Sequence, residues 1–195
     1  DKETGLTTIH NDGEGIEIEM HKTYNKWVPS LIFGELLTSS NYDKEEKKIT
    51  GGKNGYGAKL TNIFSKEFIV ETVDNVRQKK FTQKFQNNMG TKHKPKIRSS
   101  KEKPYTKISY IPDFKLFNID GYSDDMISII EKRAYDAAAT TNIKLSIYLN
   151  GKRITPNSFE KYLDLYIGSK SEAPRVYEEC NERWEIAAAL NKYHS

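Results

Sequence analysis

The feature that most constrains this chain is a glycine-rich stretch, which runs from Gly51 to Leu60 and holds four glycines within seven residues. It leads directly into an apolar, helix-compatible segment, 58–64. Glycines accept positive φ, so consecutive backbone N–H groups can point the same way, and the following helix adds its free N-terminal amides. Lys59 falls in the first helical turn, where a lone cation is unfavourable unless an anion lies nearby. The stretch predicts a polyphosphate cradle, and the alternative is a flexible loop before a helix.

A second cluster, Asn11-Asp12-Gly13-Glu14-Gly15, follows a short alternating run, 6–10, which is typical of a strand that ends in a tight turn. Asparagine and aspartate offer side-chain donors and acceptors there, and the glycines let a flat ring approach the backbone. By itself, this cluster is more often just a turn. Between the two clusters, an apolar helical stretch begins near Pro29 and leads into hydroxyl and amide residues, 38–41, which suit either a helix cap or a ribose or phosphate contact.

The glycine-rich stretch at 51–60 lies between two further strings, Leu-Leu-Thr-Ser-Ser-Asn-Tyr-Asp at 36–43 and Asn-Ile-Phe-Ser at 62–65. In this order they resemble the ATP-binding domain of eukaryotic-type DNA topoisomerase II. That family belongs, with gyrase, MutL and the histidine kinases, to the GHKL group. Arg-Ala-Tyr-Asp at 133–136, Leu-Asn-Gly-Lys at 149–152 and Asn-Glu-Arg-Trp at 181–184 resemble later landmarks, so the resemblance spans nearly the whole chain. It implies the Bergerat ATP-binding fold, with ATP and Mg²⁺ as cofactors.

The resemblance also implies a role for each matched residue. Asn11 stands where the wider family has an aspartate that reads the adenine amino group, and Gly13 and Gly15 belong to the same adenine-side turn. The segment that contacts ribose and α-phosphate oxygens corresponds to Ser39, Ser40 and Asn41. The lid that wraps the triphosphate corresponds to Gly52, Lys53, Asn54, Gly55, Tyr56, Gly57, Ala58 and Lys59. Lys53 replaces a commoner arginine, which keeps the charge but gives up a bidentate fork.

In this family, a glutamate general base and a magnesium-binding asparagine lie on a helix before the first turn, and a lysine from the next domain reaches the γ-phosphate. The resemblance places all three outside 1–195, so we expect a domain truncated at both ends, with no catalytic or metal residue on this chain and no ATP hydrolysis by it alone. The expected division is 1–180 for the ATP-binding domain and 181–195 for its last element or the start of the transducer domain.

Composition favours one globular domain. The chain has 195 residues, 36% of them hydrophobic, which is enough for one sizeable core. No run approaches about 20 consecutive apolar residues, so the sequence predicts no membrane span. The single cysteine, Cys180, fits a reducing compartment and is expected to be a buried small hydrophobe.

Positive charge is concentrated between Arg77 and Lys107, where eleven Lys or Arg residues accompany one acidic residue, Glu102. Such a block can contact nucleic-acid phosphates. Lysines also protect the solvent face and edges of strands, and the alternation in 79–85 and 105–111 favours that interpretation. Whether the block touches DNA stays open at this point.

The hydrophobic pattern predicts helices at about 29–38, 57–65, 124–141 and 157–166. Strands are predicted at 5–10, 67–74, 77–87, 105–112, 143–149 and as a final pair in 174–190, with Asn150-Gly151 as a hairpin turn. The fold class is therefore an α+β two-layer sandwich, with a mixed, mostly antiparallel sheet covered on one face by helices. The charged insert 42–50 is expected to be mobile, as are residues 41–56 as a whole.

Three classes of function follow. The first, implied by the resemblance, is the ATP-binding part of a nuclear, homodimeric type II DNA topoisomerase, which passes one DNA duplex through a transient double-strand break in another. The second is the ATP-binding domain of another GHKL protein, such as a chaperone, a kinase or a mismatch-repair protein. The third is a basic nucleic-acid-binding module without a nucleotide.

Overall fold

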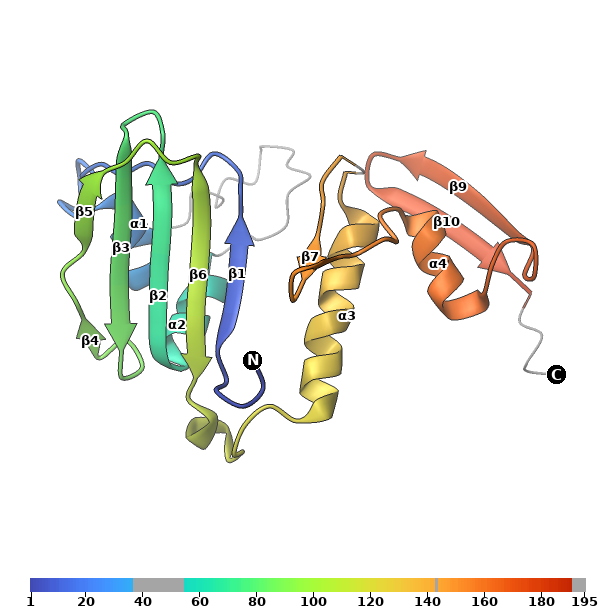
Figure 1. Cartoon of the computed structure of the whole chain (residues 1–195), viewed down its shortest axis with the longest axis horizontal. Coiled ribbons are helices and arrows are strands. Elements are labelled where there is room, and N and C mark those ends of the chain that lie inside the picture. Colours follow the sequence, from blue (N-terminus) through green and yellow to red (C-terminus); the bar gives the residue numbers. More distant parts are fainter. Residues whose placement is uncertain (37–54, 143, 191–195) are drawn as a thin grey trace. The chain divides into compact units, whose positions relative to one another are not determined.

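The chain forms two compact units in the computed structural model, which describes residues 1–36, 55–142 and 144–190. We call Asp1–Tyr122 the sheet unit and Ser123–Ser195 the second unit, and each is described by itself (Figure 1). The two units meet after Tyr122, whereas the predicted domain boundary lies after residue 180. That boundary separates the ATP-binding domain from a transducer domain, and it stays a prediction.

The sheet unit is built on a six-stranded sheet with the order β1-β6-β2-β3-β4, in which β5 also pairs with β3. Its strands are β1 (Thr7–Asn11), β2 (Ser65–Asp74), β3 (Lys79–Gln86), β4 (Thr91–Lys92), β5 (Lys96–Ser99) and β6 (Tyr105–Pro112). Helices α1 (Val28–Gly34) and α2 (Gly57–Ile63) lie on one face of it (Figure 1). The predicted two-layer α+β fold is confirmed, and every described strand pair is antiparallel.

The core of the sheet unit follows from strict alternation in its two central strands. Phe68 and Val70 of β2 and Phe81 and Phe85 of β3 point to the helix-bearing face and are each at most 1% exposed. Phe33 of α1 packs into the same cluster. Because period-two alternation puts every second side chain on one face, one register buries the whole set.

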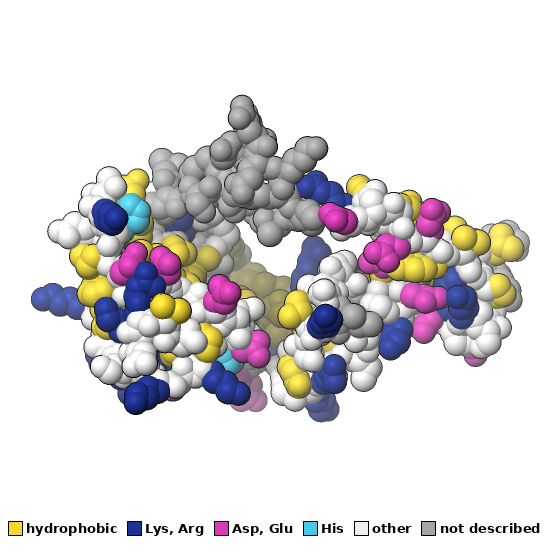
Figure 2. Space-filling model, turned by 90° about the horizontal axis from the view of Figure 1, so that it is seen from above, with side chains coloured by type: hydrophobic (Ala, Val, Ile, Leu, Met, Phe, Trp, Pro, Cys, Tyr) yellow, Lys and Arg dark blue, Asp and Glu magenta, His cyan; other side chains and the backbone are white. Residues whose placement is uncertain are grey.

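The opposite face of the sheet carries charged residues, and two lysines of the basic block have acidic partners there. Lys80 pairs with Glu71 and Glu102, and Lys84 pairs with Glu67. Both lysines lie on the face opposite the helices, as the alternation predicts, with Lys84 half-exposed and Lys80 only 12% exposed. On the face shown in Figure 2, Lys and Arg side chains are interspersed with Asp and Glu rather than gathered into one field.

Within its described residues, 123–142 and 144–190, the second unit contains two helices and two hairpins. They are α3 (Asp124–Thr140), β7 (Tyr148–Leu149), β8 (Lys152–Arg153), α4 (Phe159–Ile167), β9 (Arg175–Asn181) and β10 (Trp184–Ala189). The side chain of Ser123 accepts the N–H of Met126 and that of Ser158 accepts the N–H of Lys161, so both helices begin at serine caps. Asn150 and Gly151 have φ values of 48° and 78°, and the predicted hairpin turn between β7 and β8 is confirmed.

Several predicted boundaries were wrong. The helix predicted at 29–38 ends at Gly34, because Glu35 is already extended with φ of −130°, and residues 37 and 38 lie outside the described residues. Within the described part of the strand predicted at 143–149, residues 144–149, only Tyr148–Leu149 forms a strand, since alternation without a long partner strand gives no ladder. Strands β4 and β5 were missed because neither has an apolar alternation of its own. Cys180 is exposed rather than buried.

In the part of the chain that the structure describes, no helix has both the length and the apolar character required to cross a membrane.

Candidate functional site

Asn11 is the last residue of β1, opposite Thr106 of β6. Its Oδ1 accepts the N–H of Gly13 at 2.9 Å, which closes the turn that the sequence predicts. Within the described residues its Nδ2 has no hydrogen-bond partner, so the amide keeps two donors for another molecule. The side chain is exposed at the end of the strand.

Gly15 brings the backbone of this turn against β2. Its φ is +77°, and a Cβ atom there would lie 2.0 Å from the carbonyl oxygen of Val73, so no other residue fits without a shift of the backbone. Asn11, Gly13 and Gly15 therefore form one turn, as the sequence predicts, and it is held against the strand by direct backbone contact.

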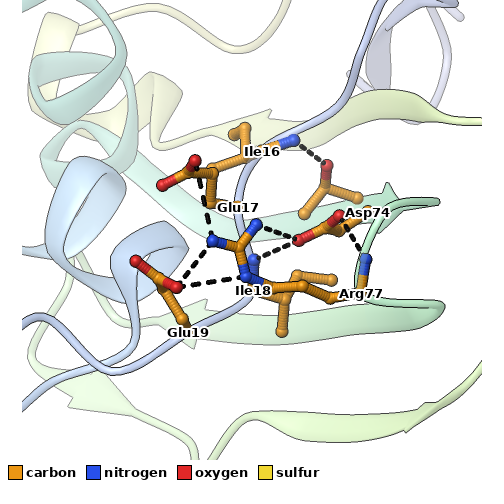
Figure 3. Close-up of polar contacts among 7 residues, drawn as sticks. Ile16, Glu17, Ile18, Glu19, Asp74 and Arg77 are labelled. Carbon is orange, nitrogen blue, oxygen red and sulfur yellow. Dashed lines mark hydrogen bonds and ion pairs between the residues drawn. The ribbon is translucent and has the colours of Figure 1, made fainter.

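The segment that follows the turn is fixed to β2 by side chains in place of a strand ladder (Figure 3). The N–H of Ile16 donates to Thr72 Oγ1 at 3.0 Å, and the N–H of Ile18 donates to Asp74 Oδ2 at 2.9 Å. Arg77 bonds to Asp74 and to Glu19, at 3.1 and 2.6 Å. Burial raises the pKa of Asp74, but the hydrogen bonds from Arg77 and Ile18 outweigh it and hold the pKa below its ordinary value.

Asn62 joins α2 to α1. Its Nδ2 donates to the carbonyl oxygen of Phe33 at 3.1 Å, and the side chain is 1% exposed. The carbonyls of the last helical turn have no partner within their own helix, so this bond satisfies one of them. Asn62 thereby fixes where α2, the helix after the glycine-rich stretch, lies on the sheet.

Lys59 is the second helical residue after Gly57 and is only 2% exposed. Its Nζ donates to the carbonyl oxygen of Gly55 at 3.2 Å, and no described carboxylate pairs with it. Burial lowers the pKa of the Lys59 ammonium from its ordinary value. A buried cation with only a carbonyl partner is costly unless an anion joins it.

The glycines before α2 differ from each other. Gly55 has φ of +66°, as a cradle requires. Gly57 does not take the positive φ expected of the glycines in this stretch, because it is already helical, and a Cβ atom there would meet nothing within 4 Å. Tyr56 is the residue that precedes the helix, and its side chain makes no cap bond. Ala58 follows in the first turn and is exposed.

The remaining predicted site residues, Ser39, Ser40, Asn41, Gly52, Lys53 and Asn54, lie outside the described residues, as does most of the segment 41–56 that was expected to be mobile.

Two threonines at the base-side turn were not predicted. Asn11, Thr106 and Thr72 lie opposite one another across β1, β6 and β2, and the two hydroxyl oxygens are 3.0 Å apart. A threonine in a strand is an ordinary β-former, so only the register could have singled these out.

Among the described residues there is no group of three or more His, Cys, Asp or Glu side chains arranged to hold a metal. These residues do not by themselves fit a magnesium site, and no chemical step through Mg²⁺ is derived from them.

Comparison with known proteins places these features in context. The chain is 51% identical over 187 residues to DNA topoisomerase 2 of Acanthamoeba polyphaga mimivirus, which covers 95% of this chain and 15% of that protein. It is 44% identical to the ATPase region of Saccharomyces cerevisiae topoisomerase II in its crystal structure, with a TM-score of 0.91 over 98% of this chain and 50% of that one. No family model matches the chain.

A more distant solved structure is the 43K ATPase domain of Thermus thermophilus gyrase B in complex with an aminocoumarin. It is 19% identical, with a TM-score of 0.54 over 72% of this chain and 32% of that one, and this similarity shows a shared fold alone. The chain spans between 13% and 15% of the length of the curated relatives it matches.

Proposed function

This chain belongs to the GHKL-type ATP-binding domains of the eukaryotic-type DNA topoisomerase II family, and from this premise we propose that it binds ATP between the base-side turn at Asn11 and the phosphate end at α2. The observation that carries the proposal is Lys59. Its ammonium is buried, its described partner is a single carbonyl, and it sits beside Gly55 at the entry to a helix. A polyphosphate supplies the negative charge that this arrangement lacks.

The base end is supported by independent contacts. The amide of Asn11 is exposed and oriented by Gly13, and the turn behind it is held to β2 by Gly15, Thr72 and Asp74. A reader for a nucleobase needs this fixed backbone, because hydrogen bonds to a base edge discriminate only when the donor and acceptor positions are set in advance.

The two ends predict different losses on mutation. Lys59→Ala should lower the affinity for ATP by about 10- to 100-fold and leave the affinity for adenosine almost unchanged, because it removes a charge-assisted phosphate contact. Asn11→Ala should lower the affinities for ATP and for adenosine by the same factor, about 5- to 100-fold, because both ligands carry the base. Titration calorimetry with ATP and adenosine measures both.

Matched controls are Lys66→Ala, an exposed lysine on β2, and Asn157→Ala in the second unit, and both should leave the two affinities unchanged. The proposal fails if the protein binds no adenine nucleotide, or if Lys59→Ala weakens adenosine as much as ATP.

For the longer protein that contains this chain, the same proposal is an ATP-driven type II topoisomerase: a homodimer in the nucleus that uses ATP and Mg²⁺ to pass one DNA duplex through another. Family membership supports it over a chaperone, a kinase or a mismatch-repair protein of the GHKL group. The test is ATP-dependent unlinking of interlocked DNA circles by the longer protein. The absence of such unlinking, with ATP binding intact, would favour another member of the group.

A further inference from the structure

A row of three polar side chains crosses the sheet at the base-side turn. Asn11, Thr106 and Thr72 are directly opposite one another on three neighbouring strands, so their side chains share the face that carries α1 and α2. Burial increases along the row: Asn11 is exposed, Thr106 is half-buried and Thr72 is 0% exposed. Cross-strand neighbours of this kind have Cβ atoms about 5 Å apart, which places Thr106 beside the amide of Asn11.

Two hydrogen bonds of Thr72 determine which threonine donates in the contact between Thr72 and Thr106. Its Oγ1 donates to the carbonyl oxygen of Tyr105 at 2.8 Å, and it accepts the N–H of Ile16 at 3.0 Å. A hydroxyl has one proton, and this one is used on a carbonyl that cannot donate in return. In the contact between the two threonine oxygens, 3.0 Å apart, Thr106 must therefore be the donor.

Because the hydroxyl proton of Thr106 is donated to Thr72, its oxygen offers only lone pairs to its other neighbours. Its single proton points back to Thr72, so beside Asn11 its oxygen can accept a hydrogen bond but cannot donate one. Adenine presents an amino donor where guanine presents a carbonyl acceptor. An amide carries both a donor and an acceptor, so Asn11 by itself suits either base edge, whereas the fixed polarity of Thr106 does not.

We propose that Thr72 is a positioning residue for base selectivity: it orients the hydroxyl of Thr106 as an acceptor and so favours adenine over guanine at the base-side turn. The inference rests on the proposed nucleotide function and deepens it. Thr72 contacts no nucleotide itself. It acts through Thr106 and, by its bond to Ile16, through the position of the turn.

The test is a competition titration of ATP against GTP on Thr72→Val and Thr72→Ser. Valine is similar in size to threonine but lacks the hydroxyl acceptor, which frees the proton of Thr106 to turn toward the base. The preference for ATP over GTP should fall by about tenfold in Thr72→Val and be retained in Thr72→Ser. A matched control is Thr8→Val, because Thr8 also shares a hydroxyl contact, 3.1 Å to Ser109, across β1 and β6 but on the opposite face.

Thr106→Val separates this role from simple support of the turn. It leaves the bond between Ile16 and Thr72 in place and removes only the acceptor beside Asn11, so it too should lower the ATP preference. It also serves as the decisive variant if Thr72→Val does not fold. Equal weakening of ATP and GTP, with the preference unchanged in either valine variant, overturns the inference. A wild-type protein that binds neither nucleotide overturns the proposed function, and the inference with it.

Discussion

The sheet unit and the second unit are stabilised by different kinds of contact. The sheet unit buries four large side chains on β2 and β3, together with Phe33 and Ile18, in one cluster. Among the described residues of the second unit, the buried ones are Ala138, Ala139, Ile154 and Arg175. Several of its large apolar side chains are instead exposed, with Val176 at 73%, Trp184 at 65% and Ile186 at 54%.

Polar contacts take the place of a core in the second unit. The hydroxyl of Tyr162 on α4 donates to Asp136 on α3, and Lys132 donates to both. Arg175 has a fully buried side chain and bonds to Asp164 and to the carbonyl oxygen of Gly168. The sheet unit is therefore held together by a buried apolar cluster, whereas the second unit depends largely on polar links, of which the exposed ones each contribute little.

The largest expected effect comes from removing a buried side chain of the sheet unit, and it is compared with the removal of an exposed side chain in the second unit. Phe81→Ala should destabilise the sheet unit by about 3 to 5 kcal/mol, because it leaves a cavity in a fully buried cluster. Ile186→Ala, in the second unit, should change stability by less than about 0.5 kcal/mol, because that side chain is already half in water. Denaturant unfolding followed by separate probes in each unit measures both. Similar losses in the two variants would contradict the difference between the two units.

The second effect tests backbone contact in the sheet unit. Gly15→Ala forces a side chain into a carbonyl at positive φ, and the conformational strain alone costs about 1 to 3 kcal/mol. Gly57→Ala is the matched control, because its Cβ atom meets open space in a helix, and it should be neutral or slightly stabilising. Thermal unfolding of the two variants is the measurement. A destabilised Gly57→Ala would contradict the open geometry there.

The third effect has the opposite sign. Burial holds the pKa of Lys59 below its ordinary value, so the unfolded chain binds this proton more tightly and stability rises with pH in the window from the lowered pKa up to the ordinary one. Lys59→Met should therefore stabilise the sheet unit without nucleotide, by about 0.5 to 2 kcal/mol, and remove that pH dependence. It should also weaken ATP. A less stable Lys59→Met would show that the ammonium is already compensated.

The smallest effect concerns the polar link of the second unit. The hydrogen bond to Asp136 raises the pKa of Tyr162 to about 12. Because the folded pKa lies above the unfolded one, the contribution of this bond is complete below the ordinary tyrosine pKa and is lost as pH rises through about 12. Tyr162→Phe should abolish that loss and leave the sheet unit unchanged. An ultraviolet titration of tyrosine ionisation in both proteins checks it, and an unaltered curve would refute the link.

The elements with strong local chemistry were predictable. The turn at Asn11 and Gly15, the helix after Gly55 and the central strands each follow from glycine, asparagine or alternation in the sequence. Gly57 was misjudged because glycine fits a helical start as well as a left-handed turn, and the sequence does not say which. Thr72 and Thr106 were not predicted, because they are brought beside Asn11 only by the pairing of β2, β6 and β1. The bare apolar residues of the second unit look like a core in the sequence, and only their exposure shows that no described element covers them.

The pairing of β1 with β6 has a consequence in time. Thr8 and Ser109 face each other but lie 101 residues apart in the chain. A ribosome adds about 5 to 20 residues per second, so on the order of 5 to 20 s pass between the emergence of β1 and that of its only described neighbour in the sheet. The hairpin of β2 and β3 is local and can close meanwhile. A nascent chain paused after β3 has emerged from the ribosome, but before Tyr105 has emerged, can pair that hairpin while β1 still lacks its described partner strand.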